Sequence, residues 1–283
     1  MTISGVLTAM VTPFDASGAL NEEAAVGLMH HLLDNGSDGL VLAGSTGESV
    51  TLSDEEMERL WRLGVAECGD AMVIAGTGSN DTRHAVHLTA LATDARVDAL
   101  LVVAPYYNKP NRRGLMAHYR AVAAATDRPV ILYNIPSRSV IDMPNQFLAE
   151  LAAEIPNVVA VKQARFEDIA PIDGLDLLAG NDDTLAETLD VGGTGGILVA
   201  SHLVGREMRR MIDEPEARRD IHESLRDLFK ALTVTTGPIP VKAALNMLGH
   251  DVGGLRLPLV PASDDEKAVV REALERHGLL ARV

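Results

Sequence analysis

The stretch Asn157-Val-Val-Ala-Val-Lys162 decides how the fold of this chain is interpreted. Its four consecutive apolar residues lie between Pro156 and the polar Gln163. An apolar run of this length with a polar exit predicts a strand that is covered on both faces, as in a parallel sheet. The rest of the chain should therefore supply helices on the outside of that sheet.

The lysine that ends this stretch needs a chemical reason, because lysine is among the residues least often fully buried. The chain has 20 Arg but only 5 Lys, so arginine supplies most of its positive charge. A lysine kept at a strand end can serve as an amine nucleophile, which arginine cannot. The alternative is a Lys162 side chain that extends past the strand end into solvent.

Strand-like and helix-like segments alternate through most of the chain. The capping-box pair Ser53 and Glu56 marks the start of one helix. Eight strand–helix units predict a (β/α)8 TIM barrel, because eight parallel strands close on themselves. A doubly wound open sheet is the alternative, but no Gly-x-Gly-x-x-Gly follows the first strand, where a dinucleotide fold would have it. Strands are expected at 5–11, 39–43, 72–75, 99–104, 129–133, 157–162, 175–179 and 195–200.

The chain continues well beyond the eighth expected strand. We expect the barrel core over residues 1–203, and the eighth helix with a C-terminal helical extension over residues 204–283. The total of 283 residues fits one barrel, which typically takes about 250 residues.

Composition excludes several classes of partner. A net charge of −15 argues against nucleic acid and anionic membrane surfaces. No apolar run reaches the ~18 residues of a membrane-spanning helix, and residues 1–12 lack the basic start of a signal peptide. Cys68 is the only cysteine, which indicates a reducing compartment and no internal disulfide. We therefore expect a cytoplasmic protein with no nucleic-acid or membrane partner.

Active sites of this fold lie at the C-terminal ends of the strands. Those ends carry Gly44-Ser-Thr-Gly47, Pro105-Tyr-Tyr107, Tyr133 and Lys162. Three of the four tyrosines of the chain thus meet at one face, and Tyr119 alone lies elsewhere. Hydroxyl groups beside a lysine suit imine chemistry, in which an amine attacks a ketone, water leaves and protons are shuttled.

At these positions the motifs become specific. Together they resemble the pyruvate-dependent class I aldolase superfamily, which includes the dihydrodipicolinate synthases and the N-acetylneuraminate lyases. The resemblance covers nearly the whole chain and implies a lyase that condenses pyruvate with L-aspartate 4-semialdehyde. It rests on Gly44-Ser-Thr-Gly-Glu48, Pro105-Tyr-Tyr-Asn108, Tyr133-Asn-Ile-Pro-Ser-Arg138, Val161-Lys162, Pro238-Ile-Pro-Val-Lys-Ala243 and Leu255-Arg-Leu-Pro258.

The resemblance also implies catalytic roles. Lys162 would form the Schiff base with pyruvate, and Tyr133 would be the general acid and base. Ser45 and Tyr107 would complete a proton relay, with Tyr107 reaching into the site of a neighbouring subunit of a homotetramer.

Substrate-binding roles follow from the same resemblance. Thr46 would hold the pyruvate carboxylate together with Ser45, through backbone amides and hydroxyls. Arg138 would bind the carboxylate of the second substrate, for which a planar bidentate donor is suited. Gly180 and Ile197 would line the pocket. The implied chemistry uses no cofactor and no metal.

The chain departs from the synthase pattern at four places. Ser45-Thr46 stands where two threonines are usual, and Ser139-Val140 replaces a small-residue pair that contains Gly. Gln163 is lyase-like, and the segment around Arg165-Phe166 is short and lacks an expected Gly. A pyruvate-dependent aldolase of a sugar acid or another 2-oxo acid is therefore the alternative function, although Arg138 favours the synthase. A barrel kept only for binding or as a scaffold is a third hypothesis.

Other polar groups have simpler explanations. His84 and His87 share a helix face without a third metal ligand, and Asp182-Asp183 suits a helix start, where acids favour the dipole. The Gly192–Gly196 run fits close backbone approach better than a phosphate site. Lys242 is a weak rival to Lys162 as the nucleophile.

Feedback inhibition by lysine is expected to be weak or absent. In inhibited synthases a polar interface pocket occupies positions that here hold Asp54, Met57, Asn80 and His84. Asn80 and nearby Tyr106 fit that pocket, whereas Met57 and His84 do not supply its usual His and Glu.

Overall fold

A computed structural model describes residues 2–281 and confirms the barrel. Within these residues, eight parallel strands pair in chain order, and β8 closes on β1. The strands are β1 Gly5–Ala9, β2 Gly39–Leu42, β3 Met72–Gly76, β4 Ala99–Val103, β5 Val130–Asn134, β6 Val158–Gln163, β7 Asp176–Ala179 and β8 Gly195–Leu198.

Helices surround the barrel, and their ends follow capping residues in the sequence. The capping box at Ser53 is formed as expected, and Asn21, Asp81 and Asn111 also cap helices with their side chains. The helices are α1 Glu22–Asp34, α2 Asp54–Glu67, α3 Thr82–Asp94, α4 Arg112–Ala123, α5 Pro136–Ser139, α6 Asn145–Glu154, α7 Leu185–Asp190, α8 Ser201–Asp213, α9 Arg218–Ala231, α10 Ile239–Met247 and α11 Asp264–Arg276.

Side chains alternate along each strand between the barrel interior and the helix layer. Buried inward-facing residues such as Leu7, Ile74 and Leu178 form the packed interior, which also contains Tyr133 and Ile197. The outward-facing set packs against the helices and forms the larger core. The barrel interior is therefore filled with side chains and is not an open pore.

The register of β5 and β6 sets the geometry at that end. Tyr133 pairs with Lys162 across the two strands, and both side chains are buried. One residue further on, Asn134 pairs with Gln163, and the Asn134 side-chain amide donates to Gln163 Oε1 at 2.9 Å. Successive side chains of a strand point to opposite faces, so those of Lys162 and Gln163 lie on opposite faces of β6.

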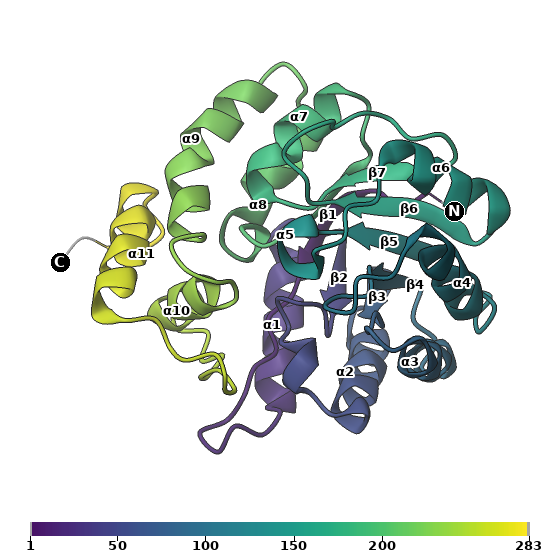
Figure 1. Cartoon of the computed structure of the whole chain (residues 1–283). Helices are drawn as coiled ribbons and strands as arrows, with labels where there is room; N and C mark the ends of the chain where they lie inside the picture. The colour runs from purple at the N-terminus through teal and green to yellow at the C-terminus, as the bar shows by residue number, and fades with distance from the viewer. Residues whose placement is uncertain (1, 282–283) are drawn as a thin grey trace.

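The last three helices lie beside the barrel, at the left in Figure 1. There α9 packs on α8 and α11, and α10 packs on α11. The chain between α10 and α11 returns to the loop after β2, where the backbone N–H of Arg256 donates to Glu48. The C-terminal region thus touches the loop expected to bind substrate.

Candidate active site

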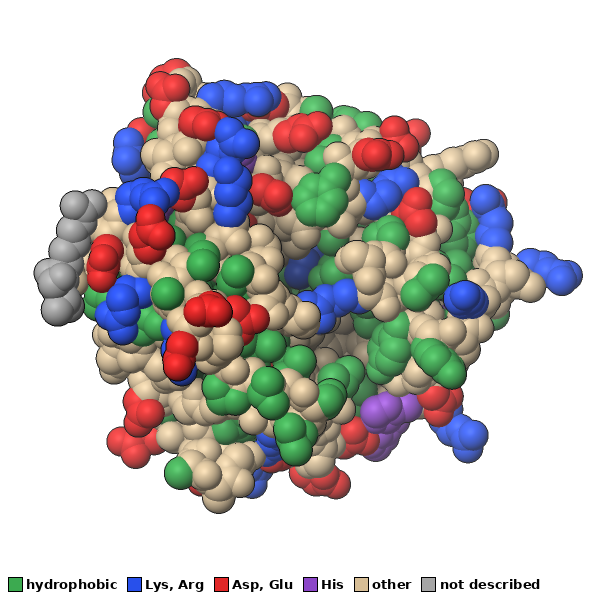
Figure 2. Space-filling view, turned by 60° about the vertical axis from the view of Figure 1, so that its left-hand side comes forward, with side chains coloured by type: hydrophobic (Ala, Val, Ile, Leu, Met, Phe, Trp, Pro, Cys, Tyr) green, Lys and Arg blue, Asp and Glu red, His purple; other side chains and the backbone are tan. Residues whose placement is uncertain are grey.

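A cavity of about 360 Å³ opens at the C-terminal end of the barrel. Figure 2 shows the hollow, with basic side chains deep inside it and at its rim. Its walls come from the loop after β2, the loops after β3 and β4, α5 and the C-terminal region. The lining residues are Ser45, Glu48, Ser49, Val50, Thr51, Gly78, Val103, Tyr106, Ile135, Arg138, Ser139, Thr236, Gly237, Pro258 and Leu259.

Lys162 is held with its amine against an aromatic ring. Its Nζ lies 4.3 Å from the centre of the Tyr133 ring, and the residue is only 5% exposed. Burial lowers the pKa of Lys162 to about 7; Asp182 opposes this change and Arg138 adds to it. A large fraction of Lys162 is therefore a neutral amine at neutral pH, which is the nucleophilic form.

Tyr133 is the hydroxyl group next to that amine. Burial raises the pKa of Tyr133 to about 12, and the charge of Arg138 acts in the opposite direction. The phenol is therefore protonated at neutral pH and can donate a proton. Tyr133 also lines a second, smaller hollow of about 30 Å³, which it shares with Gly44 and Ser45.

The loop Gly44–Glu48 is a tight turn packed against the barrel rim. Thr12 Oγ1 donates to the Gly47 carbonyl at 2.6 Å, and a Cβ on Gly47 would lie 3.0 Å from the Met10 carbonyl oxygen. A side chain at position 47 would therefore be crowded by the end of β1. Ser45 lines both hollows and is half-buried; Thr46 beside it is also half-buried but lines neither.

Arg138 lies at the cavity mouth on the short helix α5. Its guanidinium donates to the Gly237 carbonyl at 3.0 Å, and the side chain is otherwise exposed. One hydrogen bond leaves most of the guanidinium donors available. Arg138 is thus a free cation at the entrance to the pocket.

Asp182 has a place in the site that sequence reasoning missed, although its expected position at a helix start is correct. It opens the 3-10 helix Asp182–Thr184, but its carboxylate accepts the backbone N–H groups of Val199 and Ala200 at 2.9 and 3.0 Å. Burial raises the pKa of Asp182 to about 6, and Lys162 and the two amides lower it. The Asp182 carboxylate is therefore fixed by the backbone that follows β8, and its charge raises the pKa of Lys162. The position of Asp182 just after β7, at the C-terminal end of the barrel, was the feature of the sequence that could have indicated this role.

Apart from Ser45 and Arg138, the expected site residues do not line the main cavity; Tyr133 lines the smaller hollow, and Lys162 lines neither. Tyr107 is 84% exposed and has a left-handed backbone with φ of 74°. Ile197 is fully buried inside the barrel. At Gly180 an added Cβ would lie 2.7 Å from the Gln163 carbonyl oxygen, so this glycine permits close approach of two strand ends.

Comparison with known proteins identifies the family. The model of the dihydrodipicolinate synthetase family matches residues 2–277. The chain belongs to this family.

Individual relatives support the same assignment. The 4-hydroxy-tetrahydrodipicolinate synthase of Desulforudis audaxviator is 46% identical over 289 residues, covering 97% of this chain and 98% of that protein. The synthase of Bacillus subtilis is 44% identical over 280 residues, covering 94% and 97%. The crystal structure of the Cyanidioschyzon merolae enzyme with lysine bound has a TM-score of 0.95 at 41% identity, covering 98% and 99%. These relatives confirm the lyase class and favour the synthase over the sugar-acid alternative.

The segment that departs from the family pattern lies outside the pocket. Gln163 faces Asn134, and Arg165 pairs with Asp142 at 3.2 Å. Phe166 is 66% exposed. None of the three lines the cavity. The side chains of Gln163, Arg165 and Phe166 therefore have no place in the wall of the main cavity.

The departures at Ser45 and at Ser139-Val140 do meet the cavity. Ser139 lines it, and its buried hydroxyl donates to the Ile135 carbonyl at 2.8 Å. Val140 ends α5 in a left-handed conformation with φ of 61°, where glycine would be unstrained.

The histidine pair and the C-terminal lysine have structural partners. His84 Nε2 lies 2.9 Å from Asp54, and His87 Nε2 lies 3.5 Å from the same carboxylate. Across residues 2–281 no group of three or more His, Cys, Asp or Glu side chains is arranged to hold a metal ion. Lys242 is 1% exposed and pairs with Glu48. In the same range, no helix is long and apolar enough to cross a membrane.

Proposed function

We propose that this chain condenses pyruvate with L-aspartate 4-semialdehyde through an imine on Lys162, giving 4-hydroxy-tetrahydrodipicolinate. The observation that carries this proposal is the contact between the Lys162 amine and the Tyr133 ring; Tyr133 shares a small hollow with Ser45, and Ser45 and Arg138 both line the main cavity. Membership of the synthetase family supports it.

In the first half-reaction the neutral Lys162 amine attacks the ketone carbon of pyruvate. A C–N bond forms, the ketone oxygen takes up protons and leaves as water, and the imine remains. The protonated Tyr133 phenol is positioned to supply a proton to that oxygen. Ser45 and the partner subunit's tyrosine hydroxyl would return the phenol to its protonated state.

The pyruvate carboxylate would bind at the turn after β2. Ser45 and Thr46 offer hydroxyls and backbone N–H groups, and a turn of this kind forms a concave site for anions. Ser45 lines both hollows, so a carboxylate there would lie between Tyr133 and the open cavity.

In the second half-reaction the imine loses a methyl proton and becomes an enamine. The enamine carbon attacks the aldehyde, and the aldehyde oxygen takes up a proton to become the hydroxyl. The amine of the second substrate then attacks the imine carbon, which closes the ring and releases Lys162. Arg138 would hold the carboxylate of the semialdehyde during these steps, as a bidentate donor at the entrance.

We also propose a cytoplasmic homotetramer in which Tyr107 enters the site of a neighbouring subunit. The 84% exposure of Tyr107, on a loop next to the cavity residue Tyr106, supports this arrangement. The division into a barrel core over 1–203 and a C-terminal region over 204–283 remains a prediction.

Borohydride reduction in the presence of pyruvate tests the imine. We expect a stable adduct that mass spectrometry locates on Lys162, and no adduct in Lys162→Ala. Absence of the adduct, or its persistence in the variant, would refute both the synthase and the aldolase hypotheses and favour a non-catalytic barrel. Rates with aspartate semialdehyde and with sugar-acid substrates then separate the two enzymes.

A further inference from the structure

A fully buried ion pair joins the loop after β2 to the C-terminal region. Glu48 Oε1 lies 2.7 Å from Lys242 Nζ, and each side chain is only 1% exposed. Glu48 follows Gly47 in the expected pyruvate-binding turn, and Lys242 lies on α10. Neither group has a part in the proposed reaction.

Each member of the pair has further partners. Lys242 Nζ donates to the Gly254 carbonyl at 2.6 Å and lies 4.3 Å from the centre of the Phe14 ring. The second carboxylate oxygen of Glu48 accepts the backbone N–H of Arg256 at 3.0 Å. The Glu48 carboxylate is thus held from two directions, both by the C-terminal region.

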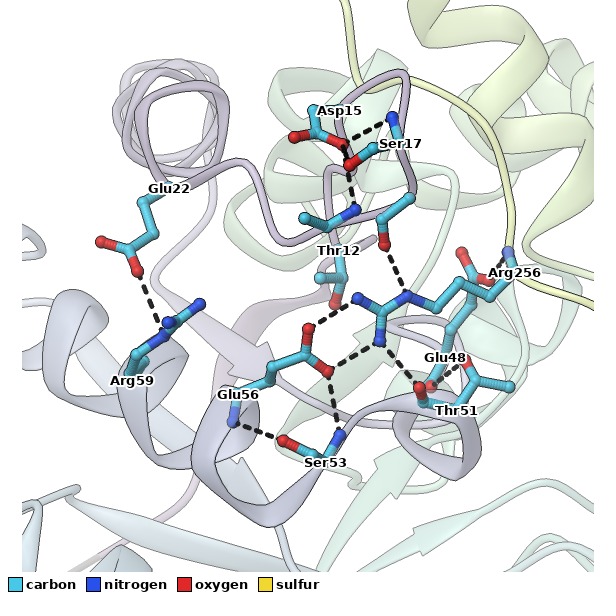
Figure 3. Close-up of polar contacts among 12 residues, drawn as sticks. Thr12, Asp15, Ser17, Glu22, Glu48, Thr51, Ser53, Glu56, Arg59 and Arg256 are labelled. Atoms are coloured by element: carbon cyan, nitrogen blue, oxygen red, sulfur yellow. Dashed lines mark hydrogen bonds and ion pairs between the residues drawn. The ribbon is translucent and has the colours of Figure 1, made fainter.

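Arg256, whose backbone N–H binds Glu48, also connects the C-terminal region to α2 through its side chain (Figure 3). Its guanidinium donates to both carboxylate oxygens of Glu56 at 2.7 and 2.6 Å, and to the Thr51 carbonyl at 2.8 Å. The same guanidinium lies 4.3 Å from the centre of the Phe14 ring. The cluster contains two carboxylates, Glu48 and Glu56, and two cations, Lys242 and Arg256, so each charge in it has a counter-charge.

The backbone of Glu48 explains why the turn needs an anchor. Glu48 is left-handed, with φ of 58° and ψ of 35°, a conformation that a non-glycine residue rarely adopts. Its N–H donates to the Ser45 carbonyl at 3.2 Å and closes the turn. Such a conformation persists where surrounding contacts fix it, and the two contacts to the Glu48 carboxylate do so here.

The pair is an inefficient way to gain stability. Desolvating two charges offsets most of their attraction, and apolar replacements of similar volume often leave stability unchanged or higher. Removing only one partner is strongly destabilising, because the other charge stays buried. A buried pair at this turn is better explained by the conformation it specifies.

We propose that Glu48 and Lys242 are positioning residues that hold the Ser45-Thr46-Gly47 turn in the shape that accepts the pyruvate carboxylate. Through them the C-terminal helical region sets the affinity for pyruvate. This inference rests on the proposed function, in which that turn binds the carboxylate.

A double substitution separates positioning from stability. Glu48→Gln and Lys242→Met alone should each lower the Tm, because each leaves an unpaired buried charge. The combined Glu48→Gln/Lys242→Met variant should recover most of that loss. Its KM for pyruvate should nevertheless rise by about tenfold, the scale of one lost hydrogen bond to a charged group. Its KM for the semialdehyde should change much less.

Glu56→Gln is the matched control. Glu56 binds the guanidinium of Arg256. The substitution therefore removes a contact of Arg256 but leaves the contacts of the Glu48 carboxylate in place. This variant should lower the Tm with no change in the KM for pyruvate. A double variant with wild-type Tm and wild-type pyruvate KM would overturn the proposal, as would an equal rise in Glu56→Gln.

Glu48→Asp keeps the test decisive if the double variant does not fold. It retains the charge but shortens the side chain by one methylene, so we expect a raised pyruvate KM. An unchanged KM would count against positioning.

The pyruvate dependence of borohydride trapping provides a readout that needs no second substrate. If the wild-type protein forms no adduct, the proposed function fails. If the wild type forms the adduct and the variants trap pyruvate with the same concentration dependence, only the positioning role fails.

Discussion

Lys162 and Tyr133 are register partners on β6 and β5, and the Lys162 Nζ lies 4.3 Å from the centre of the Tyr133 ring. Burial moves the pKa of the amine down to about 7 and that of the phenol up to about 12. Both groups are therefore largely neutral at pH 7.5 to 8, with a free nucleophile beside a proton donor. This pairing is what imine formation requires at the start of the reaction.

The pH dependence of imine formation should follow the Lys162 amine. Its pKa is lowered, so the ammonium form dominates below about pH 7 and the nucleophilic amine above it. We expect the rate constant for trapping of pyruvate to rise with pH and to level off above a midpoint near 7. Timed borohydride quenching across pH 5.5 to 9 measures this profile. A rate that keeps rising toward the ordinary lysine pKa would contradict the assigned environment.

Asp182→Asn should move that profile toward lower pH. The Asp182 carboxylate raises the pKa of Lys162, and asparagine removes the charge while keeping an oxygen for the Val199 and Ala200 amides. We expect the midpoint to fall by roughly one pH unit or less. Asp183→Asn is the neighbouring control, because Asp183 acts on Asp182 and not directly on Lys162 and should shift the midpoint much less. An unmoved midpoint in Asp182→Asn would exclude coupling to Lys162.

The barrel and the Lys162–Tyr133 pair could be predicted from the sequence. Both depend on local patterns, since each strand is a short apolar run and active-site groups follow strand ends. Once β5 and β6 are consecutive parallel strands, Tyr133 and Lys162 must meet at the same end of the barrel.

Long-range partners could not be predicted in this way. The role of Asp182 depends on two amides after β8, 17 and 18 residues further along the chain. Glu48 pairs with Lys242 only because the fold places α10 beside the loop that follows β2. Side-chain type and spacing carry no information on these contacts.

Arg138→Ala should impair the second half-reaction far more than imine formation. Arg138 lies at the mouth of the cavity and makes one hydrogen bond, to the Gly237 carbonyl. Loss of a charged pair with the semialdehyde carboxylate should cost about 1.5–3 kcal/mol in kcat/KM, or ~10–100-fold. Arg138→Lys should recover this only in part, because lysine is not a bidentate donor. Equal losses in pyruvate trapping and in turnover would refute the role.

Tyr107 should act across a subunit boundary. We expect Tyr107→Phe and Lys162→Ala to be nearly inactive alone, since each removes a different part of every site. Mixed subunits should regain up to roughly a quarter of wild-type activity, because symmetric pairing gives each hybrid dimer one complete site. Activity assayed after unfolding and refolding the two variants together measures this. Failure of the mixture, with normal assembly by light scattering, would place Tyr107 outside the neighbouring site.

Lysine should inhibit this enzyme weakly or not at all. Among the positions that form the inhibitor pocket in sensitive synthases, Met57 is 3% exposed and offers no polar group. His84 is already engaged, with Nε2 at 2.9 Å from Asp54 and Nδ1 at 3.2 Å from Ser79. A lysine ammonium would therefore compete with an existing Asp54 contact. We expect no saturable inhibition at lysine concentrations up to about 1 mM, a level that corresponds to a binding free energy of roughly −4 kcal/mol. A titration at fixed substrates, with arginine at equal concentration as the salt control, tests this expectation. Strong inhibition that saturates with lysine but not with arginine would show that Asn80, Tyr106 and Asp54 suffice for the site without the usual His and Glu.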